Sequence, residues 1–174
     1  MALTLDEKKA VVSEVAEVAA QAHSAVAAEY RGLTVGQLTE LRVKARENGV
    51  YLRVVKNSLA RLAVQGTEFE CMQDGLKGPL MLAFSVEDPG SAARIMRDFA
   101  KDNEKLVPAF GAIGGQRLEA AELSKLADMP TYDQAVSMLM SVMQAPISKF
   151  ARTLNEVPGK LVRTVEAVRL AKDA

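Results

Sequence analysis

The sequence changes its pattern at Pro130, and this change limits the possible folds more than any other feature. Before Pro130, short apolar runs typical of strands alternate with segments whose apolar residues recur at helical spacing. After Pro130 the helical spacing continues without a strand signal. We therefore predict an α/β domain over residues 1–130, with a small mixed sheet flanked by helices, and an extended, proline-interrupted helical tail over residues 131–174.

Turn and cap residues divide the first part into alternating helices and strands. Thr34 can cap the second helix and Asn57 the third, and Gly49 suits a left-handed end of the second helix. The expected strands cover residues 24–30, 50–56, 80–86 and 106–113. The expected helices cover residues 4–22, 34–48, 90–101 and 119–129, together with one after Asn57 that buries Leu59, Leu62 and Ala63.

The composition is that of a folded protein without disulfide bonds. Of the 174 residues, 49% are hydrophobic and 25% are charged, which argues against a chain that is disordered throughout. Cys71 is the only cysteine, and its simplest interpretation is a small buried apolar group. The first residues resemble an acid-punctuated helix rather than a secretion signal, and no apolar run is long enough to span a bilayer. We therefore expect a soluble intracellular protein.

Residues 31–61 concentrate positive charge in a chain whose formal net charge is zero. The segment has seven basic residues and two acidic ones, a local net charge of about +5. The basic residues are Arg31, Arg42, Lys44, Arg46, Arg53, Lys56 and Arg61. A positive sector on a neutral protein indicates a specific anionic partner, and nucleic acid is the leading candidate.

Two turns in this segment place a cation at the end of an expected strand. Arg31-Gly32 follows the first strand, and Lys56-Asn57 follows the second. If the two strands are neighbours, both cations lie on one rim of the sheet, where the next helix adds free amides and Gly32 permits close approach of a backbone. The alternative interpretation of Lys56-Asn57 is a lysine at a strand end followed by an ordinary helix cap.

The tail repeats with a period of eleven residues. Three units cover residues 139–149, 150–160 and 161–171, and the last two match closely. Eleven residues are close to a whole number of helical turns, so each unit presents the same face. The apolar residues of that face are Leu139, Met143, Phe150, Leu154, Val157, Leu161, Val165 and Val168.

A repeated apolar unit indicates a repeated partner. From Pro146 on, six basic residues stand against three acidic ones, and this net charge of about +3 favours acidic partners. Pro146 and Pro158 are expected to kink or restart the helix. The alternatives are a stripe packed on its own domain and a basic helix lying on a membrane; the prolines and the repeat argue against the membrane.

With these residues laid out, the chain resembles the bacterial large-subunit ribosomal protein L-ten family, whose members form the base of the ribosomal stalk. The resemblance covers essentially the whole chain and rests on the order and spacing of several motifs. These are Tyr30-Arg-Gly-Leu-Thr, Gly49-Val-Tyr-Leu-Arg-Val-Val-Lys-Asn-Ser-Leu, Lys77-Gly-Pro79, Pro130-Thr-Tyr and Gly159-Lys-Leu-Val-Arg-Thr-Val.

The resemblance implies an N-terminal domain that binds large-subunit ribosomal RNA in the GTPase-associated region, beside another ribosomal protein. It also implies a C-terminal helix that binds dimers of the acidic stalk protein, which recruit translational GTPases, and the repeat predicts two to three such dimers. Family members also repress translation of their own message and are cytoplasmic, on the ribosome. Mapped by motif, the RNA contacts would be Arg31, Gly32, Lys56, Asn57 and Ser58, with Arg53 and Arg61 as further candidates.

The inventory of side chains argues against an enzyme. The chain has one histidine and one cysteine, and it lacks a metal-ligand cluster, a nucleophile elbow and a phosphate-binding glycine loop. We therefore expect no catalytic residue, no metal, no cofactor and no small-molecule substrate. The remaining alternative is a protein–protein adaptor whose tail binds as a helix in a groove, without RNA.

Overall fold

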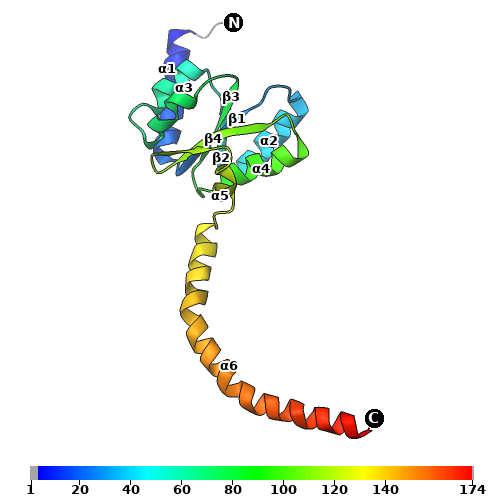
Figure 1. The fold of residues 1–174 in the computed structure, drawn as a ribbon. Coiled ribbons are helices and arrows are strands. Elements are labelled where there is room, and N and C mark those ends of the chain that lie inside the picture. Colours follow the sequence, from blue (N-terminus) through cyan, green and yellow to red (C-terminus); the bar gives the residue numbers. More distant parts are fainter. Residues whose placement is uncertain (1–3, 174) are drawn as a thin grey trace. The chain divides into compact units, whose positions relative to one another are not determined.

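The computed structural model describes residues 4–173 of the chain. The boundary between two compact units falls between Thr131 and Tyr132. The first unit is an α/β domain, and the second is one long helix, α6 (Tyr132–Asp173) (Figure 1). The predicted class, an α/β domain followed by a helical tail, is confirmed.

The α/β domain is built on one five-stranded sheet in the order β2-β3-β1-β4-β5. Its strands are β1 (Ser24–Glu29), β2 (Val50–Val54), β3 (Leu80–Ser85), β4 (Val107–Ile113) and β5 (Gln116–Glu119). Each neighbouring pair is antiparallel, so the sheet is not mixed as expected. Because β3 lies between β1 and β2, those two strands run in the same direction, as in a split β-α-β arrangement.

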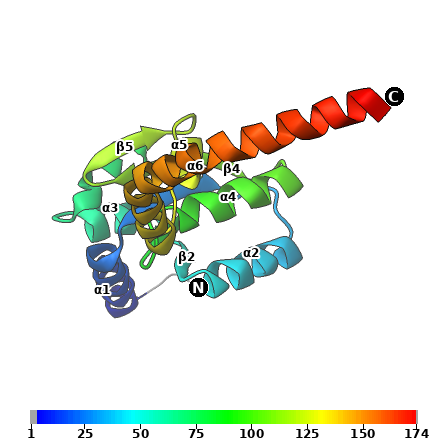
Figure 2. The ribbon, with the colours of Figure 1, turned by 90° about the horizontal axis from the view of Figure 1, so that it is seen from below.

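Helices cover both faces of this sheet (Figures 1 and 2). One face packs against α1 (Leu5–Gln21), α3 (Asn57–Val64) and the 3₁₀ helix η1 (Glu68–Gly75). The other face packs against α2 (Val35–Glu47), α4 (Ser91–Asp102) and α5 (Leu123–Ala127). The domain therefore has two hydrophobic cores, one on each side of the sheet.

The central strand, β1, shows why helices can pack on both sides. Ala25 and Ala27 belong to the core beneath α1 and α3, whereas Val26 and Ala28 belong to the core beneath α2 and α4. Successive strand residues point to opposite faces, and all four side chains are fully buried. A strand covered on both faces needs a continuous apolar run, and the small residues here let both helical layers approach closely.

The second helix begins and ends as its sequence indicates. The Thr34 side chain accepts a hydrogen bond from the backbone N–H of Gln37, and the Gln37 side chain accepts one from the Thr34 N–H at 2.9 Å. This reciprocal capping box satisfies two amides at the start of α2. After α2, Gly49 has a φ of 64°, the left-handed conformation predicted for the helix end.

Several local expectations are wrong. Leu62 is exposed rather than buried, because the inner side of α3 is formed by Ala60, Ala63 and Val64. The helix expected over residues 119–129 is reduced to α5, since the segment before it forms β5 and pairs with β4. The helix η1 was not predicted at all.

The long helix α6 continues through both prolines of the tail. Pro146 and Pro158 lie inside it, so the helix does not restart, and its ribbon curves through the segment that carries them (Figure 1). A proline removes one backbone hydrogen bond, and its ring crowds the preceding turn, which bends a helix that remains continuous.

Candidate nucleic-acid interface

The ends of β1 and β2 lie on one rim of the sheet, which brings Arg31 and Lys56 to the same side of the domain. Both strands pair antiparallel with β3, and the register sets the last residue of each against the first two residues of β3. The condition stated from the sequence, that the two strands are direct neighbours, is not met, because β3 separates them. The ends of β1 and β2 still lie on one rim, because both strands are antiparallel to β3 and therefore run in the same direction.

An open hollow of about 370 Å³ lies at this rim. Its lining residues are Tyr30, Val54, Val55, Lys56, Asn57, Ser58, Gly78, Pro79 and Leu80. Lys56 directly precedes α3, and within the described residues no side chain caps the first amides of that helix. A cation and free helix amides therefore face the same space, which suits an anion such as phosphate.

Asn57 does not cap α3, which corrects the sequence prediction. It is the first residue of the helix, and its Nδ2 donates a hydrogen bond to the carbonyl oxygen of Gly78 at 2.9 Å. This bond holds the start of α3 against the turn before β3, where Gly78 has a φ of 89°. Ser58 follows on the first helical turn and is exposed. Asn57 thus shapes the hollow, and Ser58 offers it a hydroxyl.

Arg31 and Lys56 keep their charges available to a ligand. Both side chains are exposed, and neither makes a hydrogen bond or ion pair with the described part of the chain. Gly32, directly after Arg31, is also exposed and has a φ of 94°, a conformation that favours glycine. Two free cations and an open backbone turn therefore share the rim.

Arg53 and Arg61, in contrast, are held by contacts inside the domain. Arg53 forms an ion pair with Glu14 of α1 and donates a hydrogen bond to the Tyr51 hydroxyl at 2.9 Å. The hydrogen bonds to Tyr51 and Glu14 raise the pKa of the Arg53 guanidinium. Arg61 donates from Nη2 to the carbonyl oxygen of Leu76 at 2.9 Å. Both arginine side chains are therefore engaged in contacts within the domain.

Two lysines that sequence reasoning did not single out also lie at this rim. Lys77 stands in the turn that leads into β3, and its place before a Gly-Pro turn was a usable signal. Lys105 precedes β4, and its Cδ lies 3.4 Å from where a Cβ on Gly32 would stand. Only the pairing of β4 with β1 reveals Lys105, because it is remote in the sequence. The acidic residues near the same strand ends are Glu29 and Glu104.

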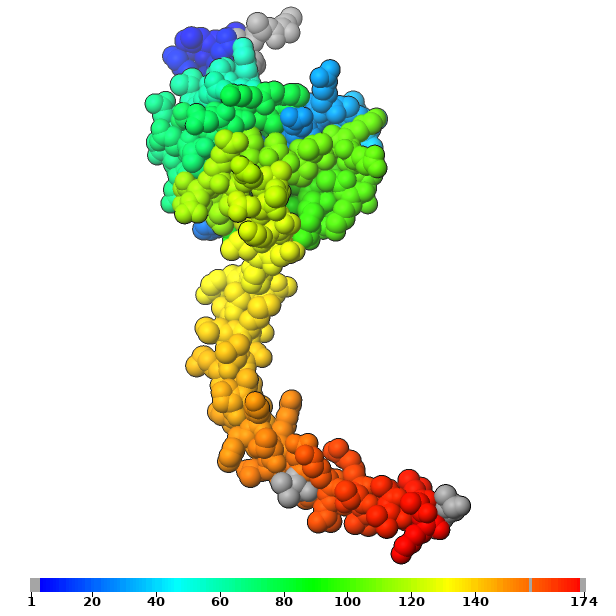
Figure 3. Space-filling view, viewed as in Figure 1, coloured from blue at the N-terminus to red at the C-terminus, as the bar shows by residue number. Residues whose placement is uncertain are grey.

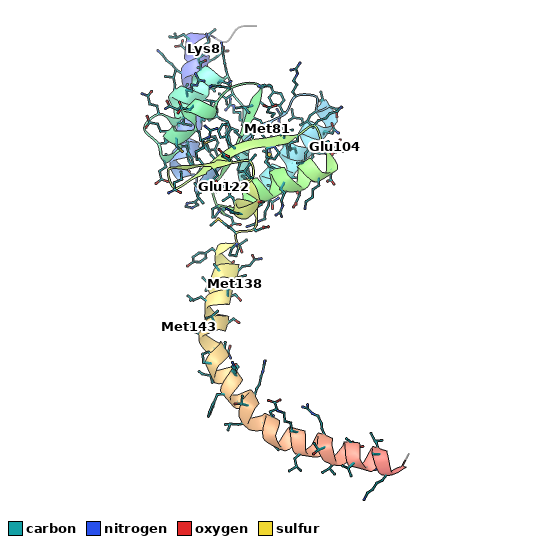
Figure 4. The ribbon with its side chains drawn as sticks, in the orientation of Figure 1. Lys8, Met81, Glu104, Glu122, Met138 and Met143 are labelled. Atoms are coloured by element: carbon teal, nitrogen blue, oxygen red, sulfur yellow. The ribbon has the colours of Figure 1, made fainter. Side chains whose placement is uncertain are left out.

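The apolar stripe of α6 is exposed. Seven of its eight predicted residues are 58–72% exposed, and the side chain of the eighth, Val157, lies outside what the structure describes. Figure 3 shows side chains open to solvent along the helix, and Met143 projects from it in Figure 4. Val136, Met140 and Ile147 extend the stripe at spacings of three and four residues, although the eleven-residue comparison had missed them.

The described residues do not form a metal site. No group of three or more His, Cys, Asp or Glu side chains among them could hold a metal ion. Burial raises the pKa of the Cys71 thiol, which favours its unreactive protonated form.

A search of the described helices for a membrane-spanning segment finds none with the required length and apolar character.

The cationic rim of the α/β unit and the exposed apolar stripe of α6 are features of a binding protein. Comparison with known proteins identifies the family. The model described as Ribosomal protein L10 matches residues 3–101, and the model described as Ribosomal protein uL10 C-terminal region matches residues 129–157. The chain belongs to the uL10 family of ribosomal proteins.

The relatives match along the full length. The chain is 68% identical over 174 residues to the large ribosomal subunit protein uL10 of Thioalkalivibrio sulfidiphilus. The corresponding values are 66% for the protein of Methylococcus capsulatus and 62% for that of Alkalilimnicola ehrlichii. Each comparison covers 100% of this chain and 99% of the relative. The chain is accordingly a structural, non-enzymatic constituent of the large ribosomal subunit, in the bacterial cytoplasm.

Proposed function

We propose that this chain is the base of the ribosomal stalk. Its α/β domain binds large-subunit ribosomal RNA in the GTPase-associated region, and α6 anchors dimers of the acidic stalk protein. The observation that carries the proposal is the convergence of exposed, unpaired cations, Arg31 and Lys56, on one rim of the domain in a chain of the uL10 family.

The rim recognises RNA through phosphate and shape. Arg31 and Lys56 neutralise phosphates, and the free amides at the start of α3 add hydrogen-bond donors beside Lys56. Gly32 lets the RNA backbone approach the turn after β1, because it has no side chain. A folded RNA is read largely by its phosphates, its 2′-hydroxyl groups and its shape. Repression of its own message would use the same rim, since a folded message offers the same groups.

Arg53 and Arg61 stabilise the elements that form the rim. Their contacts with Glu14, Tyr51 and Leu76 hold β2 and α3 in place, so the RNA meets a rigid surface. We assign these two arginines to positioning rather than to direct contact. Lys77 and Lys105 join the contact surface, because they lie at the same strand ends.

The stripe of α6 provides the docking sites for the acidic partner. Apolar side chains that are exposed along a helix favour burial in a groove of another protein. The basic residues beside the stripe complement an acidic dimer and accelerate its association. Two closely matching units and one weaker unit predict two to three bound dimers. The dimers would recruit translational GTPases, and a neighbouring ribosomal protein would contact the α/β domain.

The RNA site is tested by electrophoretic mobility shift with the double variant Arg31→Ala/Lys56→Ala. Loss of two phosphate contacts should weaken binding to the ribosomal RNA fragment at least about tenfold and lower the salt slope by about 1.5. The control, Arg152→Ala/Arg163→Ala, removes the same charge from α6 and should bind normally. Unchanged affinity and salt slope in the rim variant would count against this surface.

The tail sites are tested by native mass spectrometry of the chain with the acidic stalk protein. Two or three bound dimers are expected, and Leu161→Glu should reduce the number, because it places a charge in the stripe of the last unit. The control, Leu170→Glu, makes the same change at an exposed leucine nine residues further on, on the opposite side of the helix. A single bound dimer in the unmodified chain would show that the number of repeat units does not equal the number of docking sites.

A further inference from the structure

The outer edge of β2 is open. Within the described part of the chain, β2 is the first strand of the sheet order and pairs only with β3. Among the described residues, no backbone hydrogen bond outside this ladder involves Val50–Val54. A strand edge of this kind presents a row of backbone donors and acceptors that an additional strand can satisfy. Natural proteins usually cover such an edge, and this one borders a groove instead.

The groove runs between the helices on the two sides of β2 and has a volume of about 530 Å³. Figure 2 shows β2 between α1 and α2, which belong to opposite faces of the sheet. The lining residues are Glu14, Arg42, Arg46, Val50, Tyr51, Leu52, Arg53 and Val54. Of the charged residues that the structure describes on these walls, three are basic and one is acidic.

The two helical walls of the groove differ. On the α1 side, Glu14 already holds Tyr51 and Arg53, so this wall is neutral and fixed. On the α2 side, Arg42 and Arg46 are exposed and make no ion pair or hydrogen bond through their guanidinium groups to the described residues. The uncompensated charge of the groove thus lies along α2.

The spacing of the two free arginines fits an extended chain. Arg42 and Arg46 lie one helical turn apart, a rise of about 6 Å. Side chains on one face of a strand repeat every two residues, about 6.8 Å. The helix α2 leads into β2 through Asn48-Gly49 and packs against it, and both arginines line the groove together with Val50–Val54. Alternate carboxylates of an added strand would therefore meet them in turn.

We propose that an extended, acidic segment of a partner polypeptide adds to the sheet as a strand beside β2. Its backbone pairs with Val50–Val54, and alternate acidic side chains bind Arg42 and Arg46. This docking site meets the RNA rim only at Val54, which lines both, and it does not involve the stripe of α6, so neither of those proposals has to hold for it to form.

The walls of the groove favour a peptide over a nucleic acid. Single-stranded RNA needs exposed aromatic faces on which bases stack. Among the described residues that line this groove, Tyr51 is the only aromatic one; it packs against the core, and its hydroxyl donates to Glu14 at 2.7 Å. Leu52 and Val54, which are not fully buried, offer apolar contacts that alternate side chains of a peptide can use.

The proposal is tested by a backbone amide NMR titration of the full chain with a synthetic octapeptide of alternating glutamate and threonine. The expected result is saturable shifts confined to Val50–Val54 and the arginine-bearing turn of α2. Methylation of alternate backbone nitrogens of the octapeptide, on the edge that would face β2, should abolish these shifts, because it removes the pairing donors and leaves the charges intact. An octauridylate probe should not displace the octapeptide.

The variant Arg42→Glu/Arg46→Glu should bind the octapeptide at least about tenfold more weakly, since both charge-assisted contacts become repulsive. Lys8→Glu/Lys9→Glu makes the same change of net charge on α1, outside the groove, and should bind normally. The proposal is overturned if no shifts appear at millimolar octapeptide, if the N-methylated form binds equally well, or if octauridylate displaces the octapeptide from β2.

Discussion

Glu14 joins α1 to the open strand β2 through two side chains. The Tyr51 hydroxyl donates to the Glu14 carboxylate at 2.7 Å, and Arg53 forms an ion pair with it. Hydrogen bonds from Tyr51, and then from Arg53, hold the pKa of the Glu14 carboxyl below its usual value. The group is exposed, so solvent screens it, and its importance lies mainly in fixing the position of Arg53.

This lowered pKa predicts an acid-dependent loss of stability. Because the folded pKa lies below the unfolded one, the carboxylate stabilises the fold above the unfolded pKa, and the contribution is lost as pH falls through the folded pKa. Glu14→Gln removes this contribution, so its thermal midpoint should fall less steeply with acidification than that of the unmodified chain. Glu17→Gln, one turn along α1, serves as the control. Parallel midpoint curves for Glu14→Gln and the unmodified chain would contradict the assignment.

Substitution by alanine is expected to lower the free energy of unfolding at Gly49 and to raise it at Gly36. Gly49 has a φ of 64°, and a Cβ there would lie 3.0 Å from the Glu87 side chain. Gly49→Ala should therefore lower the free energy of unfolding by about 1–3 kcal/mol. Gly36 lies in the first turn of α2 with no atom within 4 Å of an added Cβ, and Gly36→Ala should raise stability by about 0.5–1 kcal/mol. Urea unfolding measures both, and equal effects would refute the backbone argument.

At the scale of elements, β3 and α6 place the same residue type in opposite environments. Phe84 on β3 is buried and packs edge-to-face on Phe69, with ring centroids 6.0 Å apart. Phe150 on α6 is 65% exposed. The first ring stabilises the domain, whereas the second is available to a partner.

This contrast predicts a large difference between two matched alanine variants. Phe84→Ala should reduce the free energy of unfolding by about 3–5 kcal/mol, because it leaves a cavity in the core. Phe150→Ala should change it by less than about 0.5 kcal/mol and instead weaken binding of the acidic partner. Urea unfolding followed by tyrosine fluorescence compares the two. A strongly destabilised Phe150→Ala variant would mean that the stripe supports the fold rather than a partner.

At the scale of the whole molecule, the chain assigns its two proposed interactions to separate units. Residues 4–131 contain both hydrophobic cores and the cationic rim, and residues 132–173 contain the exposed stripe. A chain that is neutral in total thus carries local positive charge in both places. The boundary between Thr131 and Tyr132 permits each unit to bind without the other.

Removal of residues 132–174 should therefore separate the two functions. The shortened chain should bind the ribosomal RNA fragment with unchanged affinity, since the rim is intact, and should bind no acidic stalk dimer. Mobility shift and native mass spectrometry measure the two outcomes. If the shortened chain is folded by circular dichroism but binds RNA more weakly, the assignment of RNA binding to the α/β unit alone is contradicted.

Much of the fold could be predicted because it follows from local patterns. The capping box at Thr34, the left-handed Gly49 and the apolar run of β1 all depend on neighbours in the sequence. The failures were at places where distant segments compete. Asn57 donates to Gly78 instead of capping α3, and Leu62 is exposed because smaller residues on α3 face the core. No local pattern can report a hydrogen bond across 21 residues.

The sequence by itself determined the class of fold, the helical tail, its apolar stripe and the two cations at strand ends, because periodicity and turn chemistry act over a few residues. Only the tertiary structure decided which cations are free. It placed β3 between β1 and β2, brought Lys105 beside Gly32, tied Arg53 to Glu14 and left the edge of β2 open. The physical reason is that strand order and ion pairing depend on contacts between residues that are far apart in the chain.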